Sequence, residues 1–259
     1  MTERNPFDHH VHGALSGDST VPLEERARTA RGDRPHGISE HFPSEYLKDD
    51  DDVLQYVDRA KALGLAVALE YDIGLAPRLR PSTRDALDYL VGGLHQVTVD
   101  GALLSYDASG EFIKGRSAVY ADARIFTDDP TLAPKVLAAI LEALEASFER
   151  DRIDVLAHPT FSPLRALGDP ETLYPIEWQE RFIALCVRYD VAIEVNESYR
   201  VPHAPFIERA KAAGARFAVG SDSHEALLPL RYTLDLVART GVRERLRGQL
   251  ASGSRATSS

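Results

Sequence analysis

The chain has 259 residues, of which 44% are hydrophobic and 27% charged, and its formal net charge is −10. This composition is typical of a globular protein with a sizeable core and excludes collagen-like, disordered and coiled-coil classes. The acidic balance argues against long nucleic acid or an anionic membrane as the main partner. Because there is a single cysteine, a disulfide framework and a cysteine-rich zinc module are excluded, and metal ligands must be His, Asp or Glu.

Neither an N-terminal secretory signal nor a membrane-spanning segment is expected from the sequence. The first residues lack an apolar stretch, and no run approaches the roughly 18 apolar residues that span a bilayer. We therefore expect a cytoplasmic protein that has no membrane partner. A single domain is expected over residues 1–251, and the Ser-rich residues 252–259 are expected to be a disordered tail.

Short apolar, β-branched runs alternate with helical patterns from about residue 53 onward. In the clearest unit, Asp52 is expected to cap a helix that ends at Gly64, before a strand at 65–69. The unit recurs as helix 131–150 with strand 153–157, helix 175–189 with strand 191–195, and helix 203–213 with strand 216–220. Further strands are expected near the N-terminus, before Ser39 and at 91–94. This alternation predicts βα units, a parallel sheet and the α/β class.

Polar residues of metal-binding types follow these strands, at the end where parallel α/β barrels carry their active sites. They are Asp8, His10, His12, Glu40, His41, Glu70, Asp72, His95, His158, Asn196, Asp222 and His224.

The tripeptide His10-Val11-His12 places two imidazoles on one face of a strand, because side chains alternate with a period of two. One cation can bind both rings. Asp8 lies on the same face and is expected to accept a hydrogen bond from an imidazole behind the metal.

Together, the segments Asp8-His9-His10-Val11-His12, Gly37-Ile38-Ser39-Glu40-His41, Ala68-Leu69-Glu70, His158-Pro159 and Ser221-Asp222-Ser223-His224 resemble the ordered motifs of the PHP (polymerase and histidinol phosphatase) superfamily. Residues 92–95, 194–200 and 220–222 resemble its histidinol-phosphate phosphatase branch. The resemblance covers about residues 7–225 and implies a distorted (β/α)7 barrel. It also implies a metal site at the carboxyl ends of the strands. This site is expected to hold two to three divalent ions, which are zinc, manganese or iron in the family.

The resemblance also implies a role for each matching residue. His10, His12 and Asp222 match ligands of a first metal, and Glu70 matches a carboxylate that bridges two ions. His95 and His158 match ligands of the second metal, and His41 and His224 match ligands of the third. Asp18 stands where a third-site His is usual, and its hard oxygen favours manganese or magnesium over zinc there. Three residues depart from the usual motif without removing a ligand: Gly13, Glu40 and Gly93. Glu40 is expected to lie behind the ligands and to contact them rather than a metal.

The chemistry that follows is hydrolysis of a small phosphomonoester of the histidinol-phosphate type. Clustered cations lower the pKa of a bridging water and neutralise the phosphoryl oxygens, so Glu70 and Asp222 are expected to be catalytically essential. Arg200 and Arg165 are candidates for binding the phosphate, with Arg200 favoured, and His203 is a further candidate for contacting the substrate.

Three alternatives remain open at this point. A PHP phosphoesterase can act on a mononucleotide or an oligonucleotide end, and a PHP-like module without metals can serve as a scaffold. The scaffold is expected to have eroded ligand positions, whereas every position here holds a competent residue. An amidohydrolase-type barrel also uses H-x-H, but it normally has a metal-bridging Lys after a middle strand, and no predicted strand here ends in one.

Overall fold

A computed structural model describes residues 5–32, 34–105, 118–120 and 123–248 of the chain. Its central feature is a parallel sheet whose strands are hydrogen-bonded in the order β1 (Gly37–Phe42), β2 (Ala66–Asp72), β3 (Val91–Gly93), β7 (Val155–Leu156), β8 (Ala192–Asn196) and β9 (Phe217–Gly220). The predicted α/β class and parallel sheet are therefore confirmed.

The N-terminal segment 8–12 joins the two edges of this sheet. On one side, Asp8 exchanges backbone hydrogen bonds with Pro35 and Gly37, both of 3.0 Å, just before β1. On the other side, His9 N–H donates to the carbonyl of Val219 in β9 over 2.8 Å. The strand expected near the N-terminus is thus an extended segment with isolated bridges. Since the sheet has six regular strands, the expected count of seven β/α units is not confirmed.

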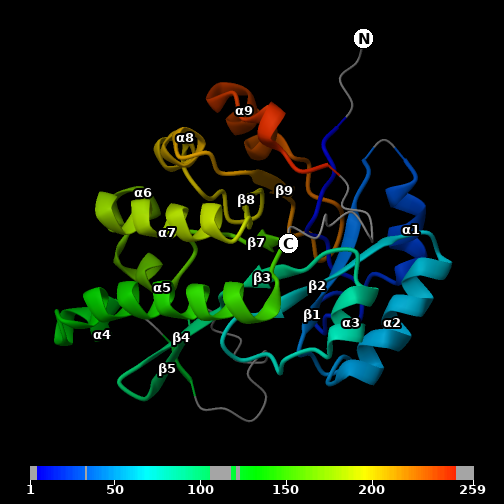
Figure 1. Cartoon of the computed structure of the whole chain (residues 1–259), viewed down its shortest axis with the longest axis horizontal. Coiled ribbons are helices and arrows are strands. Elements are labelled where there is room, and N and C mark those ends of the chain that lie inside the picture. Colours follow the sequence, from blue (N-terminus) through cyan, green and yellow to red (C-terminus); the bar gives the residue numbers. More distant parts are fainter. Residues whose placement is uncertain (1–4, 33, 106–117, 121–122, 249–259) are drawn as a thin grey trace.

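Helices cover the outside of the curved sheet (Figure 1). The longer ones are α1 (Leu23–Ala30), α2 (Asp50–Ala62), α5 (Leu132–Asp151), α7 (Ile176–Arg188), α8 (Ala204–Ala212) and α9 (Arg231–Thr240). Shorter helical segments are α3 (Pro81–Ala86), α4 (Ala123–Asp128), η2 (Pro163–Leu167), α6 (Pro170–Leu173) and η3 (Arg243–Arg245). The helices expected at 131–150, 175–189 and 203–213 are confirmed to within two residues at each end.

The cap of α2 differs from the prediction. Asp49, not Asp52, caps this helix, and its Oδ1 accepts the backbone N–H groups of Asp51 and Asp52 at 2.9 and 3.1 Å. The run of four aspartates offers several candidate caps. Asp49 is the one with extended backbone angles, so the helix begins immediately after it.

A second, three-stranded sheet was not predicted. It consists of β4 (Gln96–Val99), β5 (Ala102–Ser105) and β6 (Ala118–Tyr120), inserted between β3 and α4. Within the described ranges, no helix is both long and apolar enough to cross a membrane. The tail predicted at 252–259 lies outside the described residues.

The two faces of the sheet carry different side chains, as the period of two requires. On β2, Val67 and Leu69 belong to the large core between sheet and helices, whereas Ala66 and Ala68 belong to a separate inner cluster. The inner cluster is rich in small residues, which allows the strands to curl closely around it. Glu70 continues the inner series, so its side chain enters the same interior at the carboxyl end of the strand.

Candidate metal centre

All nine predicted metal ligands converge at the carboxyl ends of the strands. His10, His12 and Glu70 are fully buried, and the most accessible of the nine are Asp18 and His224, whose side chains are 30% and 28% exposed. The geometry allows three overlapping groups to hold an ion: His10, His12 and Glu70; His41, Glu70 and His95; and His12, Asp18, His41 and His224. The residues come from segment 8–18 and from the ends of β1, β2, β3, β7 and β9.

The carboxylate of Glu70 lies at the centre of the cluster and faces a different set of imidazoles with each oxygen. Its Oε1 lies 3.1 Å from Nε2 of His95 and 3.0 Å from Nε2 of His158. Its Oε2 lies 3.2 Å from Nε2 of His10 and 3.4 Å from Nε2 of His12. Oε2 also lies 3.0 Å from Nδ1 of His41. One carboxylate therefore faces two imidazoles with one oxygen and three with the other, an arrangement suited to bridging two cations.

Space for this carboxylate depends on Gly93. A Cβ built at that position would collide with Oε1 of Glu70 and would lie 2.7 Å from Cε1 of His95. In this structure, the absence of a side chain at position 93 leaves room for the Glu70 carboxylate and the His95 ring.

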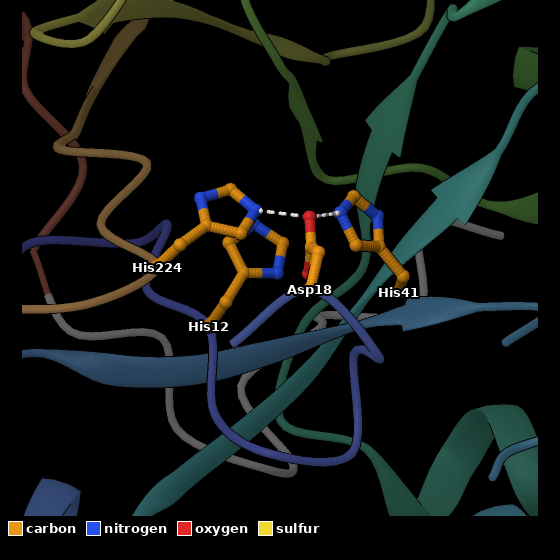
Figure 2. Close-up of side chains that lie close together, drawn as sticks. All are labelled: His12, Asp18, His41 and His224. Atoms are coloured by element: carbon orange, nitrogen blue, oxygen red, sulfur yellow. Dashed lines mark ion pairs between the residues drawn. The ribbon is translucent and has the colours of Figure 1, made fainter. Parts of the chain in front are cut away.

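Four side chains that lie close together, His12, Asp18, His41 and His224, are called here the outer group (Figure 2). Asp18 and His224 are its more exposed members. Asp18 Oδ2 lies 2.8 Å from Nε2 of His224 and 3.4 Å from Nε2 of His41. The rings of His12 and His224 are stacked, with centroids 4.1 Å apart. Three ring nitrogens and a carboxylate oxygen thus point toward a common centre.

Unpartnered ring nitrogens show that the inner residues fit a metal. Nε2 of His10 and Nε2 of His12 are buried and have no hydrogen-bond partner. Each also has a partner on its other nitrogen that fixes the tautomer: Glu194 Oε1 lies 2.9 Å from Nδ1 of His10, and Ser16 Oγ lies 2.9 Å from Nδ1 of His12. With the proton held on Nδ1, each Nε2 lone pair is available to a cation, the usual arrangement for metal-bound histidine.

Glu194 was not singled out as a site residue by sequence. It is fully buried near the end of β8, and its Oε2 accepts from the backbone N–H of His158 at 2.6 Å and from Nδ2 of Asn196 at 2.9 Å. It therefore orients His10 and His158 together. The signal in the sequence is a glutamate on the inner face of an otherwise apolar strand.

Ser16 was also missed. Its hydroxyl donates to Oε2 of Glu40 over 2.6 Å, so its oxygen accepts from Nδ1 of His12 and, at 3.1 Å, from the backbone N–H of His41. Glu40 thus lies behind the candidate ligands and acts on His12 through Ser16.

Asp8 does not play the predicted role. Its Oδ1 accepts from the backbone N–H groups of Ser221 at 2.8 Å and His10 at 3.2 Å, and its Oδ2 pairs with Arg34 at 2.7 Å. Asp8 thus fastens the N-terminal segment to the end of β9. The carboxylate at Nδ1 of His10 is that of Glu194, because His10 projects into the interior toward β8.

The electrostatics reflect this crowding of imidazoles and carboxylates. Burial alone would raise the pKa of Glu70, but His10, His41 and His95 hold it well below its usual range. Asp222 shows the same behaviour, with His10 and His12 lowering its pKa against the effect of burial. Burial and the neighbouring His224 and His41 lower the pKa of His12. The carboxylates are therefore ionised, as metal ligands must be.

A cavity of about 140 Å³ opens beside these side chains. Besides seven of the nine candidate ligands, it is lined by Phe161, Arg165 and Tyr199. The guanidinium of Arg165 lies over the ring of Phe161, 4.2 Å from its centroid. Arg200, which the sequence favoured, is exposed in the turn after β8 and does not line this cavity. His203 does not line it either, and its Nε2 lies 2.8 Å from Oδ1 of Asp169.

Comparison with solved structures found proteins with this fold. The crystal structure of histidinol phosphate phosphatase from Lactococcus lactis subsp. lactis Il1403, complexed with zinc, L-histidinol and phosphate, superposes with a TM-score of 0.59. The two chains are 14% identical, and the match covers 95% of this chain and 97% of that one. A putative histidinol phosphatase from Listeria monocytogenes gives a TM-score of 0.57 at 20% identity, over 85% of this chain and 95% of that one.

No protein-family profile matches the sequence, and no curated protein sequence matches it. At these identities, the solved structures show a common fold. The chain thus shares the fold of two histidinol phosphatase structures over most of its length, and a fold of this kind was expected from the resemblance.

Proposed function

We propose that the chain is a metal-dependent phosphatase that hydrolyses a small phosphomonoester of the histidinol-phosphate type. The observation that carries this proposal is the divided environment of Glu70, with two imidazoles at one oxygen and three at the other. The neighbour complexed with zinc, L-histidinol and phosphate supports the reaction class.

Three ion positions follow from the side chains. His10, His12 and Asp222 would hold one cation, His95 and His158 a second, and Glu70 would bridge the two. Asp18, His41 and His224 would hold a third, more accessible cation. Bound divalent ions such as zinc, manganese or iron would supply a nucleophile from water near neutral pH and neutralise the phosphoryl oxygens.

The remaining roles belong to the protein itself. Glu194 and Ser16 keep the Nδ1 protons of His10 and His12 in place, so that both Nε2 lone pairs face the centre. Arg165, at the cavity wall, is positioned to donate to phosphoryl oxygens. Phe161 and Tyr199, whose ring centroids are 3.8 Å apart, form an apolar wall for the organic part of the substrate.

The test is Glu70→Gln, which keeps the size of the side chain and removes its charge. We expect near-complete loss of phosphatase activity on a panel of phosphomonoesters that includes mononucleotides, and a loss of bound metal by elemental analysis. Circular dichroism is expected to be unchanged. The matched control is Glu149→Gln on the exposed side of α5. Wild-type turnover in Glu70→Gln, or wild-type protein that holds less than one metal per chain after metal-replete expression, would contradict the proposal.

A further inference from the structure

A buried arginine lies behind the outer group. Arg26 belongs to α1 and is only 2% exposed, on the same helix face as the buried Leu23 and Ala27. None of the ion pairs within the described part of the chain includes Arg26. A guanidinium that is removed from water without such a pair must satisfy its donors in another way.

The donors of Arg26 go to backbone carbonyls of two separate segments. Nε donates to the carbonyl of His12 over 2.7 Å, and Nη2 donates to the carbonyls of His224 over 2.9 Å and Ser223 over 3.3 Å. The hydroxyl of Ser19 also donates to the carbonyl of His224. Arg26 therefore connects the residue that ends the H-x-H segment with the turn after β9.

The two histidines whose carbonyls it binds are the stacked pair of the outer group. Their rings lie 4.1 Å apart with an interplanar angle of 15°, although they come from positions 12 and 224 of the chain. Stacking keeps the two rings parallel, but it does not by itself fix the positions of the two backbone segments that carry them. Charge-assisted hydrogen bonds from one rigid guanidinium to both backbones do fix it.

We infer that Arg26 is a positioning residue for a cation held by the outer group, acting through the backbones of His12 and His224. This inference rests on the proposed metal-dependent function. The outer group depends on Arg26 more than the other two groups do, because both of the ligands that it fastens belong to the outer group. The group of His10, His12 and Glu70 shares only one of them, His12, and the group of His41, Glu70 and His95 shares neither. His95 and His158 are held elsewhere, by Asp72 and Glu194.

The experiment measures metal binding directly. Metal-free protein is titrated with Mn²⁺, and the number and affinity of bound ions are read by calorimetry and elemental analysis. We expect the ion of the outer group to be the weakest bound, because Asp18 and His224 are the most exposed ligands. In Arg26→Met, which keeps an apolar stem, this ion is expected to lose about tenfold to hundredfold in affinity. An ion that shares only His12 is expected to lose less, and an ion at His95 and His158 is expected to be unchanged. Arg26→Lys is expected to restore part of the loss, because an ammonium donates to one carbonyl but cannot span both segments with a planar fork.

The matched control is Arg28→Met, on the same helix with a side chain that is 72% exposed; all its affinities are expected to match wild type. Equal weakening of every ion, or no weakening of any, in Arg26→Met would overturn the inference. If Arg26→Met does not fold, Arg26→Lys decides the matter: unchanged binding or equal weakening of every ion overturns the inference, and preferential loss of the weakest ion supports it. Wild-type protein that binds no ion would contradict the proposed function itself.

Discussion

Glu40 fills the space that a side chain at position 13 would need. A Cβ built on Gly13 would lie 2.6 Å from Oε1 of Glu40, while Oε2 of the same carboxylate accepts the backbone N–H of Gly13 at 3.0 Å. In the PHP motifs that this sequence resembles, Ser or Thr is usual at position 13 and Asp is usual at position 40. The smaller residue at position 13 and the longer one at position 40 therefore fit together, and Oε2 of Glu40 also accepts a hydrogen bond from Ser16.

The first prediction tests whether the two residues fit together in this way. Gly13→Ser is expected to destabilise the protein by about 1–3 kcal/mol, because the added atoms overpack a buried contact. Combining it with Glu40→Asp is expected to recover part of that loss, since the shorter carboxylate withdraws. Urea unfolding of the two single variants and the double variant gives the coupling energy. Gly32→Ser, where an added Cβ meets the Thr29 carbonyl only at 3.4 Å, is the control. Strictly additive effects would show that the two positions are independent.

The second prediction concerns pH and the metal-free protein. Burial alone would lower the pKa of His41, but Glu70 and Asp18 raise it to about 9. In the unfolded chain the pKa is near 6.5, so the folded state binds the extra proton between these values. The resulting stability is complete below pH 6.5 and is lost as the pH rises through about 9.

The measurement is urea unfolding of chelator-treated protein between pH 6 and 9.5. Wild type is expected to lose stability with rising pH over this range, and His41→Gln is expected to lose less, because the group that titrates is gone. Parallel curves for the two proteins would show that His41 does not contribute in this way.

The third prediction concerns the ligand that distinguishes the outer group. Asp18 supplies a hard oxygen between His41 and His224. Asp18→His replaces it with nitrogen, so zinc is expected to be retained more strongly relative to manganese at the weakest site. Competition dialysis against both metals measures the ratio, with Asp58→His on the exposed face of α2 as the control. An unchanged ratio would mean that Asp18 is not a ligand.

Helices and strands could be predicted from the sequence where one face of the element is buried along its whole length, because apolar residues then recur at a regular spacing. Helices 175–189 and 203–213 and the strands beside them were predicted because their apolar spacing reports one buried face. The small sheet β4–β6 was missed, since β4 and β5 are four residues each and too short for alternation to stand out. At the N-terminus, the period of two placed His10 and His12 on one face. It could not show that the segment forms only isolated bridges, because these depend on both β1 and β9.

The site shows a similar division between what could and could not be predicted. His, Asp and Glu residues at strand ends can be recognised one by one, because topology brings equivalent strand ends together. Hydrogen bonds across the site depend on tertiary structure. Glu194 and His10, for example, are 184 positions apart, and no local sequence pattern pairs them. Asp8 was assigned to an imidazole because it shares a strand face with His10, yet its carboxylate binds backbone N–H groups instead.

The choice between Arg165 and Arg200 as the phosphate ligand also depends on tertiary structure, which no local sequence pattern shows. By motif position, Arg200 was the favoured phosphate ligand, following Asn196 at the end of β8. Its backbone, however, has a φ of 55°, and its side chain lies in the exposed turn outside the cavity. Arg165 lines the cavity from η2, supported by contact with Phe161.

The fourth prediction therefore assigns phosphate binding to Arg165. Charge-assisted hydrogen bonds are worth about 1.5–3 kcal/mol, so Arg165→Ala is expected to lower kcat/KM about tenfold to hundredfold on small phosphomonoesters. Arg165→Lys is expected to recover only part of this loss, because an ammonium lacks the planar fork that matches two phosphoryl oxygens. Metal content is expected to stay unchanged in both, which separates a substrate contact from damage to the site. Arg200→Ala is the matched comparison and is expected to keep nearly full activity. If Arg200→Ala instead loses activity while Arg165→Ala does not, the turn after β8 must close over the cavity when substrate binds, and the motif position would have identified the correct arginine.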